Sequence, residues 1–232
     1  MNCVCLVFFQ QGHNISGSVS PIWAGFRGIW RYCRTMTPDL LLALLGFTFA
    51  TSVTPGPNNM MLLASGVNFG LRRTVPHILG VCTGHAFLVL MTGLGLSGLF
   101  RAVPQAIVVL KVVSVIYMLW LAWKIAHAAA PRPGVAGGKP FTYLQAAAFQ
   151  WVNPKAWAMA MGAISAYAGD GGFGAVLTIA VVFAAVNLPS VSLWAALGEV
   201  VRHWLQSPSR LRAFNWTMAA LLVASLIPVL QI

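Results

Sequence analysis

The sequence predicts an all-α integral membrane protein with six transmembrane helices, arranged as two inverted three-helix repeats. Three observations predict this class: an apolar composition, uncharged runs long enough to cross a bilayer, and a polar, proline-containing motif in each half. Of the 232 residues, 59% are hydrophobic and 7% are charged, whereas soluble domains carry about 25% charged residues. Because so few charges cannot cover the surface of a water-soluble globule, the composition excludes both a soluble domain and a disordered chain.

Runs without a charged residue define four of the predicted spans, which cover residues 40–71, 74–100, 171–198 and 213–232. Each run reaches the roughly 20 residues that a transmembrane helix needs. Two further spans, 102–123 and 140–169, each contain one internal lysine. Lys111 lies near the start of its span, from which a long side chain reaches the headgroups. Lys155 lies near the middle of its span, where a charged residue is rare and commonly functional.

Basic residues predict the orientation of the chain in the membrane. The opposite side of the core carries Arg101 and Lys111, and basic residues gather on the cytoplasmic side of membrane proteins. The connections after the first, third and fifth spans are therefore expected in the cytoplasm, with both ends of the core outside. The net charge of +11 then follows from topology, and no nucleic-acid partner is expected. The eight basic residues of these three connections are Arg72, Arg73, Lys124, Arg132, Lys139, Arg202, Arg210 and Arg212.

Three boundaries divide the chain. The Pro- and Gly-rich segment 131–141 is predicted to be a cytoplasmic linker between two three-helix repeats, 36–130 and 142–232. Because each repeat has an odd number of spans, the second enters the membrane from the opposite side, which is a common plan in transporters. Residues 1–35 fit neither a spanning helix nor a signal peptide. They are interpreted as an N-terminal extension that is disordered or results from a misassigned start upstream of Met36.

Each repeat contains a motif that interrupts its first span. A single helix over residues 40–71 would be about 48 Å long, whereas the hydrocarbon core is about 30 Å thick. Proline removes a backbone donor and clashes with the preceding turn, and glycine adds backbone freedom. A broken helix is therefore expected in each repeat. The motifs read Thr54-Pro55-Gly56-Pro57-Asn58-Asn59 and Gln150-Trp151-Val152-Asn153-Pro154-Lys155.

Both motifs also contain residues that restart a helix. Asn153 is a favoured N-cap and Pro154 suits the first helical position. In the first motif either Thr54 with Pro55 or Gly56 with Pro57 is able to serve in the same way. A new helix N-terminus presents unpaired N–H groups and a partial positive charge. The predicted helix-break residues are Thr54, Pro55, Gly56, Pro57 and Pro154.

The breaks predict a substrate site, because inverted repeats bring two helix N-termini together near the midplane, where they suit a carboxylate. The expected binding residues are Asn58, Asn59, Asn153 and Lys155. The amides would hold the carboxylate and amine of the substrate, and Lys155 would either pair with the carboxylate or reset the empty site. The alternative is that the prolines are structural kinks and the asparagines join helices. Paired breaks at corresponding positions favour a site.

Other polar residues in the spans are candidates for a proton or cavity role. His77 is expected at the membrane interface, and His85 shares its helix face because it lies eight residues further on. Asn187 is expected either to line the cavity or to mark a kink. Gly80 and Gly84 form a small-xxx-small pair that predicts close helix packing. The sequence has no metal-binding or nucleophile motif, so no metal, cofactor or catalytic residue is expected and an enzyme is disfavoured.

At these motifs the chain resembles the LysE/RhtB superfamily of bacterial amino-acid exporters, which includes efflux proteins for homoserine, threonine and lysine. The resemblance extends from about Thr37 to the C-terminus. It rests on Thr54-Pro55-Gly56-Pro57-Asn58, Ala64-Ser65-Gly66, Asn68-Phe69-Gly70-Leu71-Arg72-Arg73, Pro76-His77, Gly80, Tyr117-Met118-Leu119-Trp120-Leu121 and Asn153-Pro154-Lys155.

The resemblance implies six spans in the bacterial cytoplasmic (inner) membrane and efflux of amino acids or close derivatives, driven as is usual for such exporters by the proton motive force. We expect alternating access, with an amino acid and membrane lipid as partners, and a homodimer is compatible with six short spans. Because the spans contain no internal carboxylate, a neutral amino acid such as threonine, homoserine or leucine is favoured over a basic one. The alternatives are an exporter of another small solute or cation and a structural membrane protein that transports nothing.

Overall fold

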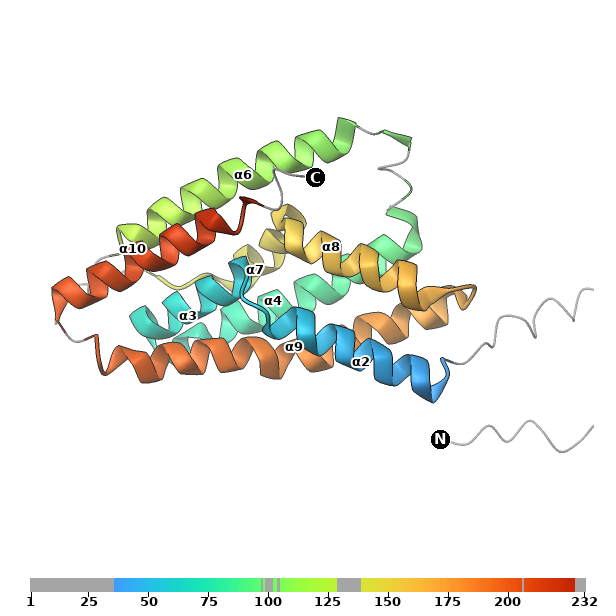
Figure 1. Ribbon diagram of the computed structural model, residues 1–232, viewed down its shortest axis with the longest axis horizontal. Coiled ribbons are helices and arrows are strands. Elements are labelled where there is room, and N and C mark those ends of the chain that lie inside the picture. The colour runs from blue at the N-terminus through green and yellow to red at the C-terminus, as the bar shows by residue number, and fades with distance from the viewer. Residues whose placement is uncertain are drawn as a thin grey trace, which may run out of the picture. The chain divides into compact units, whose positions relative to one another are not determined.

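A computed structural model describes residues 36–96, 98, 102–103, 105–128, 139–205 and 207–227 (Figure 1). Within these ranges the protein is helical, without a β-strand. The predicted extension 1–35 lies outside the described residues, as does most of the predicted linker. In chain order the elements are α2 (Pro38–Val53), α3 (Pro57–Phe69), α4 (Leu71–Met91), η1 (Thr92–Leu96), α6 (Gln105–Ala126), α7 (Tyr143–Phe149), η2 (Gln150–Val152), α8 (Pro154–Ala163), η3 (Ile164–Ala168), α9 (Gly172–Arg202) and α10 (Pro208–Ala224).

Three of the described helical segments are long and apolar enough to cross a membrane. They are Leu71–Leu96, Gln105–Ala126 and Gly172–Arg202. The helices α2 and α3 make a fourth if they are taken as one span, bent by 54° at the break between them. The 17-residue α10 and the short helices α7 and α8 do not reach this length individually. The helical, apolar architecture agrees with the predicted class, and the number of six spans stays a prediction.

Local sequence explains where several helices begin. Thr37 caps α2 by accepting a hydrogen bond from the backbone N–H of Leu40. Ser207 caps α10 through the N–H of Arg210, and each of these caps is followed by proline at the first helical position. The helix α7 begins at a capping box formed by Thr142 and Gln145, which exchange side-chain and backbone hydrogen bonds.

The helix α9 packs against α2, α3 and α4, while α4 also packs against α7 and α6 pairs with α10. Glycines permit the closest of these approaches. A Cβ atom added to Gly66 of α3 would overlap the carbonyl oxygen of Ala195 in α9. On α4, a Cβ atom added to Gly80 would overlap the carbonyl oxygen of Tyr143 in α7, and one added to Gly84 would lie 2.6 Å from Ala147 Cα in the same helix. This contact confirms the close packing predicted for the pair Gly80 and Gly84.

The three connections that carry most of the basic residues have a common location. Figure 1 shows the junction of α3 with α4, the end of α6 and the connection from α9 to α10 at the same end of the helices. Glu199, near the end of α9, accepts a hydrogen bond from the backbone N–H of Leu71 and so joins two of these connections. A shared end is what the predicted orientation requires, although the side of the membrane on which it lies stays a prediction.

Candidate functional site

The first helix break lies between α2, which ends at Val53, and α3, which begins at Pro57. Gly56 is the N-cap of α3, so of the two predicted restarts the structure adopts Gly56 with Pro57. Gly56 has no side chain with which to cap α3. The N-terminus of α3 therefore keeps the unpaired N–H groups and partial positive charge of a helix start.

The carboxyl end of α2 is held by side chains from outside that helix. Asn59 Nδ2 donates hydrogen bonds to the carbonyl oxygens of Ser52 and Thr54, each at 2.9 Å. The oxygen of Thr54 also accepts from Lys155 Nζ at 2.6 Å. Trp194 of α9 donates its indole N–H to the carbonyl of Val53, in the last turn of α2, at 3.3 Å. A broken helix leaves such carbonyls without intrahelical partners. Here they accept two hydrogen bonds from the Asn59 amide, one from an indole N–H and one from an ammonium.

The second helix break is capped locally. The helix α7 ends at Phe149, the 3-10 turn η2 follows, and α8 begins at Pro154. Asn153 Oδ1 accepts a hydrogen bond from the backbone N–H of Lys155 at 3.1 Å. This bond confirms the predicted roles of Asn153 as N-cap and Pro154 as first helical residue.

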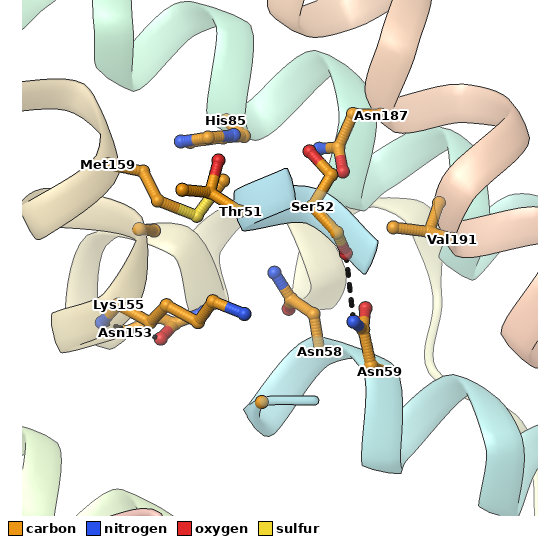
Figure 2. Close-up of a pocket in the computed structure, with 12 residues that line it drawn as sticks. Thr51, Ser52, Asn58, Asn59, His85, Asn153, Lys155, Met159, Asn187 and Val191 are labelled. Atoms are coloured by element: carbon orange, nitrogen blue, oxygen red, sulfur yellow. Dashed lines mark hydrogen bonds between the residues drawn. The ribbon is translucent and has the colours of Figure 1, made fainter. Parts of the chain in front are cut away.

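The two breaks contact each other, although their motifs lie far apart in the sequence. Asn58 Nδ2 donates to Gln150 Oε1 at 2.9 Å, and Gln150 Nε2 donates back to Asn58 Oδ1 at 3.1 Å. The Lys155 side chain lies against Gly56, where an added Cβ atom would be 2.7 Å from Lys155 Cδ. Figure 2 shows Asn58 and Asn59 of α3 on one side, with Asn153 and Lys155 at the start of α8 facing them.

Gln150 is a part of this arrangement that sequence reasoning left out of the candidate site. It is fully buried, and besides Asn58 it bonds the carbonyl of Ala146 one turn earlier. The signal available in the sequence was its place as the first residue of the second motif, a polar side chain inside an apolar span. That position does not reveal its partner, because the partner is 92 residues away.

A small cavity of about 20 Å³ lies where the breaks meet, which is room for about one water molecule. We call it the break cavity. It contains all four of the predicted binding residues, together with the candidates His85 and Asn187, whereas His77 does not line it. Its lining residues are Thr51, Ser52, Gly56, Asn58, Asn59, His85, Asn153, Lys155, Ala156, Met159, Asn187 and Val191.

Two polar atoms of the break cavity are buried without a hydrogen-bond partner in the described part of the chain. They are Ser52 Oγ and Nε2 of His85, whose ring lies edge-on to Phe183 with centroids 4.8 Å apart. Asn187 is buried as well, and the predicted kink beside it does not interrupt α9, which runs continuously through Pro189. The cavity thus combines amides, two hydroxyls, an imidazole and one ammonium, and this set is suited to a small polar ligand with a carboxylate.

The carboxylates of the chain lie elsewhere. Asp39 is exposed in the first turn of α2, and Asp170 is exposed in the turn before α9. Glu199 lies near the end of α9, where it bonds Leu71. These are the three acidic residues of the whole sequence, so the break cavity holds a cation without an acidic counter-ion.

His77 is buried in the protein. It is 1% exposed, and its ring stacks on Phe141, which precedes α7, with centroids 5.3 Å apart. The place of His77 at the membrane interface stays a prediction. His77 and His85 do share the buried face of α4, as the spacing predicts. His85 lines the break cavity, whereas His77 lines a second cavity that is described below.

A family of translocators matches most of the chain. The family described as "LysE type translocator" matches residues 49–225. The chain belongs to the LysE family. This LysE-family protein is 30% identical over 190 residues to a cysteine/O-acetylserine efflux protein of Klebsiella pneumoniae subsp. pneumoniae, covering 81% of this chain and 95% of that protein. It is 29% identical over 191 residues to a protein of the same name from Escherichia coli strain K12, covering 81% and 96%.

These similarities confirm the family to which the motifs point. No solved structure significantly matches this LysE-family protein. Its family and its apolar helices identify it as a multi-pass protein of the inner membrane.

Proposed function

We propose that this LysE-family protein is a secondary exporter of amino acids or close derivatives that works by alternating access at the break cavity. The observation that carries the proposal is the direct contact of two helix breaks through Asn58, Gln150 and Lys155, in a family of translocators. Two helix N-termini, amides and a single cation at one point suit the carboxylate and amine of an amino acid. We propose Asn58, Asn59, Asn153 and Lys155 as its binding residues.

The proposed substrate is a small neutral amino acid. The relatives are named for efflux of cysteine and O-acetylserine, which are both neutral α-amino acids. A basic side chain would need a carboxylate partner, and the break cavity has none. Hard cations prefer several carboxylate or carbonyl oxygens, so the same lack of acids disfavours an exporter of divalent cations.

Lys155 has a defined task in each half of the proposed cycle. Without substrate its ammonium neutralises the carbonyl end of α2 through the bond to Thr54. A substrate carboxylate is a stronger partner for an ammonium than a peptide carbonyl, so binding would draw Lys155 from Thr54. The carbonyl of Thr54 still accepts from Asn59, so α2 would stay capped while Lys155 holds the substrate.

The cavity has to widen before it takes a substrate, because its present volume suits about one water molecule. The Asn58–Gln150 pair is the direct side-chain link between the two breaks, and its two hydrogen bonds would separate as the cavity opens. The inverted repeats 36–130 and 142–232 would then move against each other. Alternating access in repeat transporters commonly takes this form.

The proton motive force is the proposed energy source. Proton relays in membranes commonly use embedded Asp, Glu or His, and His85 with Lys155 are the titratable groups that line the break cavity. We expect a protonophore to stop export in energised cells or vesicles. Export that continues unchanged after the proton gradient collapses would exclude this energy source while leaving the substrate proposal intact.

The proposed topology puts the connections after the first, third and fifth spans in the cytoplasm and both core ends outside. Its support is the common end of these connections together with their basic residues. Alkaline phosphatase fused after Asp170 should be active outside the cytoplasm, whereas the same enzyme fused after Ser207 should be inactive. The reverse pattern would overturn the orientation.

The function is tested by measuring efflux of every proteinogenic amino acid and O-acetylserine from cells that produce the protein. We expect faster efflux and higher tolerance for a few small neutral substrates, and loss of both in the variant Asn58→Ala at equal amounts in the membrane fraction. If no amino acid responds, the chain exports another solute or acts structurally. Normal efflux by Asn58→Ala would remove this residue from the proposed site.

A further inference from the structure

A second and much larger cavity lies between α3, α4, α6 and α7, with a volume of about 470 Å³. We call it the large cavity. Pockets that bind small molecules measure roughly 300–1,000 Å³, so its size suits an amino acid, whereas the break cavity is closed to one. Its lining residues are Met61, Ala64, Ser65, Asn68, Phe69, His77, Leu121, Lys124, Ile125, His127, Ala128, Lys139, Pro140, Phe141, Thr142 and Gln145.

The large cavity is polar and basic at its mouth and buried within. Lys124, Lys139 and Gln145 are exposed side chains of its lining, whereas Asn68 and His77 are buried. Lys124 lies at the end of α6, where three basic connections share one end of the helices (Figure 1). A cavity that opens at this end faces the proposed cytoplasmic side, from which an exporter receives its substrate.

The charge of the lining selects for an anionic group. Among the described residues that line the cavity, two are lysines and none is acidic. Lys124 Nζ lies 5.6 Å above the ring of Phe141, a cation–π contact that holds the ammonium at the mouth. A carboxylate entering here meets two ammonium groups without an acidic competitor.

Inside the cavity, two buried side chains lack the partners that buried polar groups normally have. Asn68 donates to Asn215 and Ala64, but its Oδ1 has no partner in the described part of the chain. Both ring nitrogens of His77 are likewise buried and unbonded in that part. These atoms are closed to solvent as they stand, so a turn of each side chain would expose Asn68 Oδ1 as an acceptor for an ammonium and the imidazole as a donor and an acceptor. Met61, Leu121 and Ile125 add an apolar wall for a short side chain.

Two helices connect the large cavity with the break cavity. On α3, Met61 lines the large cavity and Asn58 lines the break cavity, about 4.5 Å apart along the helix axis. On α4, His77 and His85 line the two cavities and lie about 12 Å apart along the axis. The two cavities share no lining residue, so they are separate sites about one helical turn apart along α3.

From these observations we infer that the large cavity is a loading site, which binds the carboxylate of a small neutral amino acid before the substrate reaches the break cavity. This inference rests on the proposed function for the identity of the ligand. Lys124 and Lys139 attract the carboxylate, Asn68 and His77 bind the polar backbone of the ligand, and the apolar wall accepts its side chain. An anionic lipid headgroup offers similar chemistry and is the competing source of the ligand.

The test measures equilibrium binding of labelled O-acetyl-L-serine to the purified full-length protein in nanodiscs of phosphatidylcholine. The double variant Lys124→Gln/Lys139→Gln should bind about tenfold more weakly or worse, because two charged partners are removed. The control Arg210→Gln/Arg212→Gln removes the same charge from exposed residues of α10 that do not line the cavity, and it should bind like the unmodified protein.

Three results would overturn the loading site. The first is equal binding by the Lys124→Gln/Lys139→Gln variant and the unmodified protein, and the second is an equal loss of binding in the control Arg210→Gln/Arg212→Gln. The third is competition by O-acetylserine methyl ester as strong as by O-acetylserine, because the ester lacks the carboxylate. Phosphatidylglycerol that co-purifies with the unmodified protein but not with the double variant, without O-acetylserine binding, would assign the cavity to lipid instead.

Binding and export report separately on the two proposals. Binding that depends on Lys124 and Lys139 in a protein whose cells export no amino acid would support the site and contradict the proposed function. Export that depends on Asn58, combined with binding indifferent to both lysines, would support the function and contradict the loading site.

Discussion

At the first helix break, α3 starts at a glycine that offers no side-chain cap, and the end of α2 depends on Lys155, Trp194 and Asn59. At the second break, Asn153 caps α8 from within the same motif. The first break thus receives bonds from elsewhere in the fold, whereas the second is complete locally and provides Lys155 across the contact. The difference teaches that the second helix start is capped from within its own motif, whereas the ends at the first break are also bonded by side chains from elsewhere in the fold.

This asymmetry separates two kinds of substitution. Changes at Lys155 or Gly56 act on the contact between the breaks, so we expect them to reduce export more than stability. Changes to a local cap act on one helix, so we expect a small loss of stability. The largest expected effect is therefore loss of export at the contact between the breaks, and the smallest is loss of stability at a cap.

The substitution Lys155→Met should reduce export by about 10- to 100-fold. It removes the ammonium that bonds Thr54, and a hydrogen bond to a charged group is worth about 1.5–3 kcal/mol. Transport by protein reconstituted in proteoliposomes measures the effect. Lys111→Met is the matched control, because Lys111 lies on α6 and lines neither cavity. Equal losses in both variants would show that a general change in charge, not the contact between breaks, is responsible.

The substitution Gly56→Ala should reduce export by about tenfold while the protein still folds. Gly56 has a φ of −172°, an extended backbone that alanine also adopts, so the effect is steric. The added Cβ would lie 2.7 Å from Lys155 Cδ and displace that flexible side chain, and a small misplacement at a site costs considerable rate. Gly46→Ala is the control, because no atom lies within 4 Å of its added Cβ. Unchanged export by Gly56→Ala would argue against the observed position of Lys155.

The substitutions Asn58→Leu and Gln150→Met should each lower the free energy of unfolding by about 1–3 kcal/mol, because the first leaves the buried Gln150 without this partner and the second leaves the half-buried Asn58 without it. The double variant should lose less than the sum of the two, because neither unpaired amide remains. Unfolding of the purified protein in a denaturing detergent series measures these values. Strictly additive losses would mean that the two amides do not pair in the membrane.

The substitution Asn153→Ala should lower the free energy of unfolding by about 1 kcal/mol, the usual cost of losing an N-cap. Ser207→Ala removes the corresponding cap of α10 and should cost about the same. The two variants should differ in export, since Asn153 lines the break cavity and Ser207 does not. Identical export by both would reduce Asn153 to a structural cap.

Local features of the site were predictable from the sequence, whereas its long-range contacts were not. The start of α8 at Asn153 and Pro154 follows from capping preferences that act within three residues. The choice of Gly56 over Thr54 as the cap of α3 was open, because both residues suit that position before a proline. The stacking of His77 on Phe141 was not predicted, because Phe141 lies in another part of the chain.

The sequence by itself determined the membrane class, the family and the presence of two interrupted helices, because composition and proline chemistry act locally or through averages. The tertiary structure decided which side chains meet: Asn58 with Gln150, and Lys155 with the carbonyl of Thr54. It also decided that His77 and His85, on one face of α4, line two separate cavities. These pairings depend on how α4 packs against α3 on the one hand and against α7 and α8 on the other, and a hydrogen bond across 92 residues leaves no pattern in the sequence.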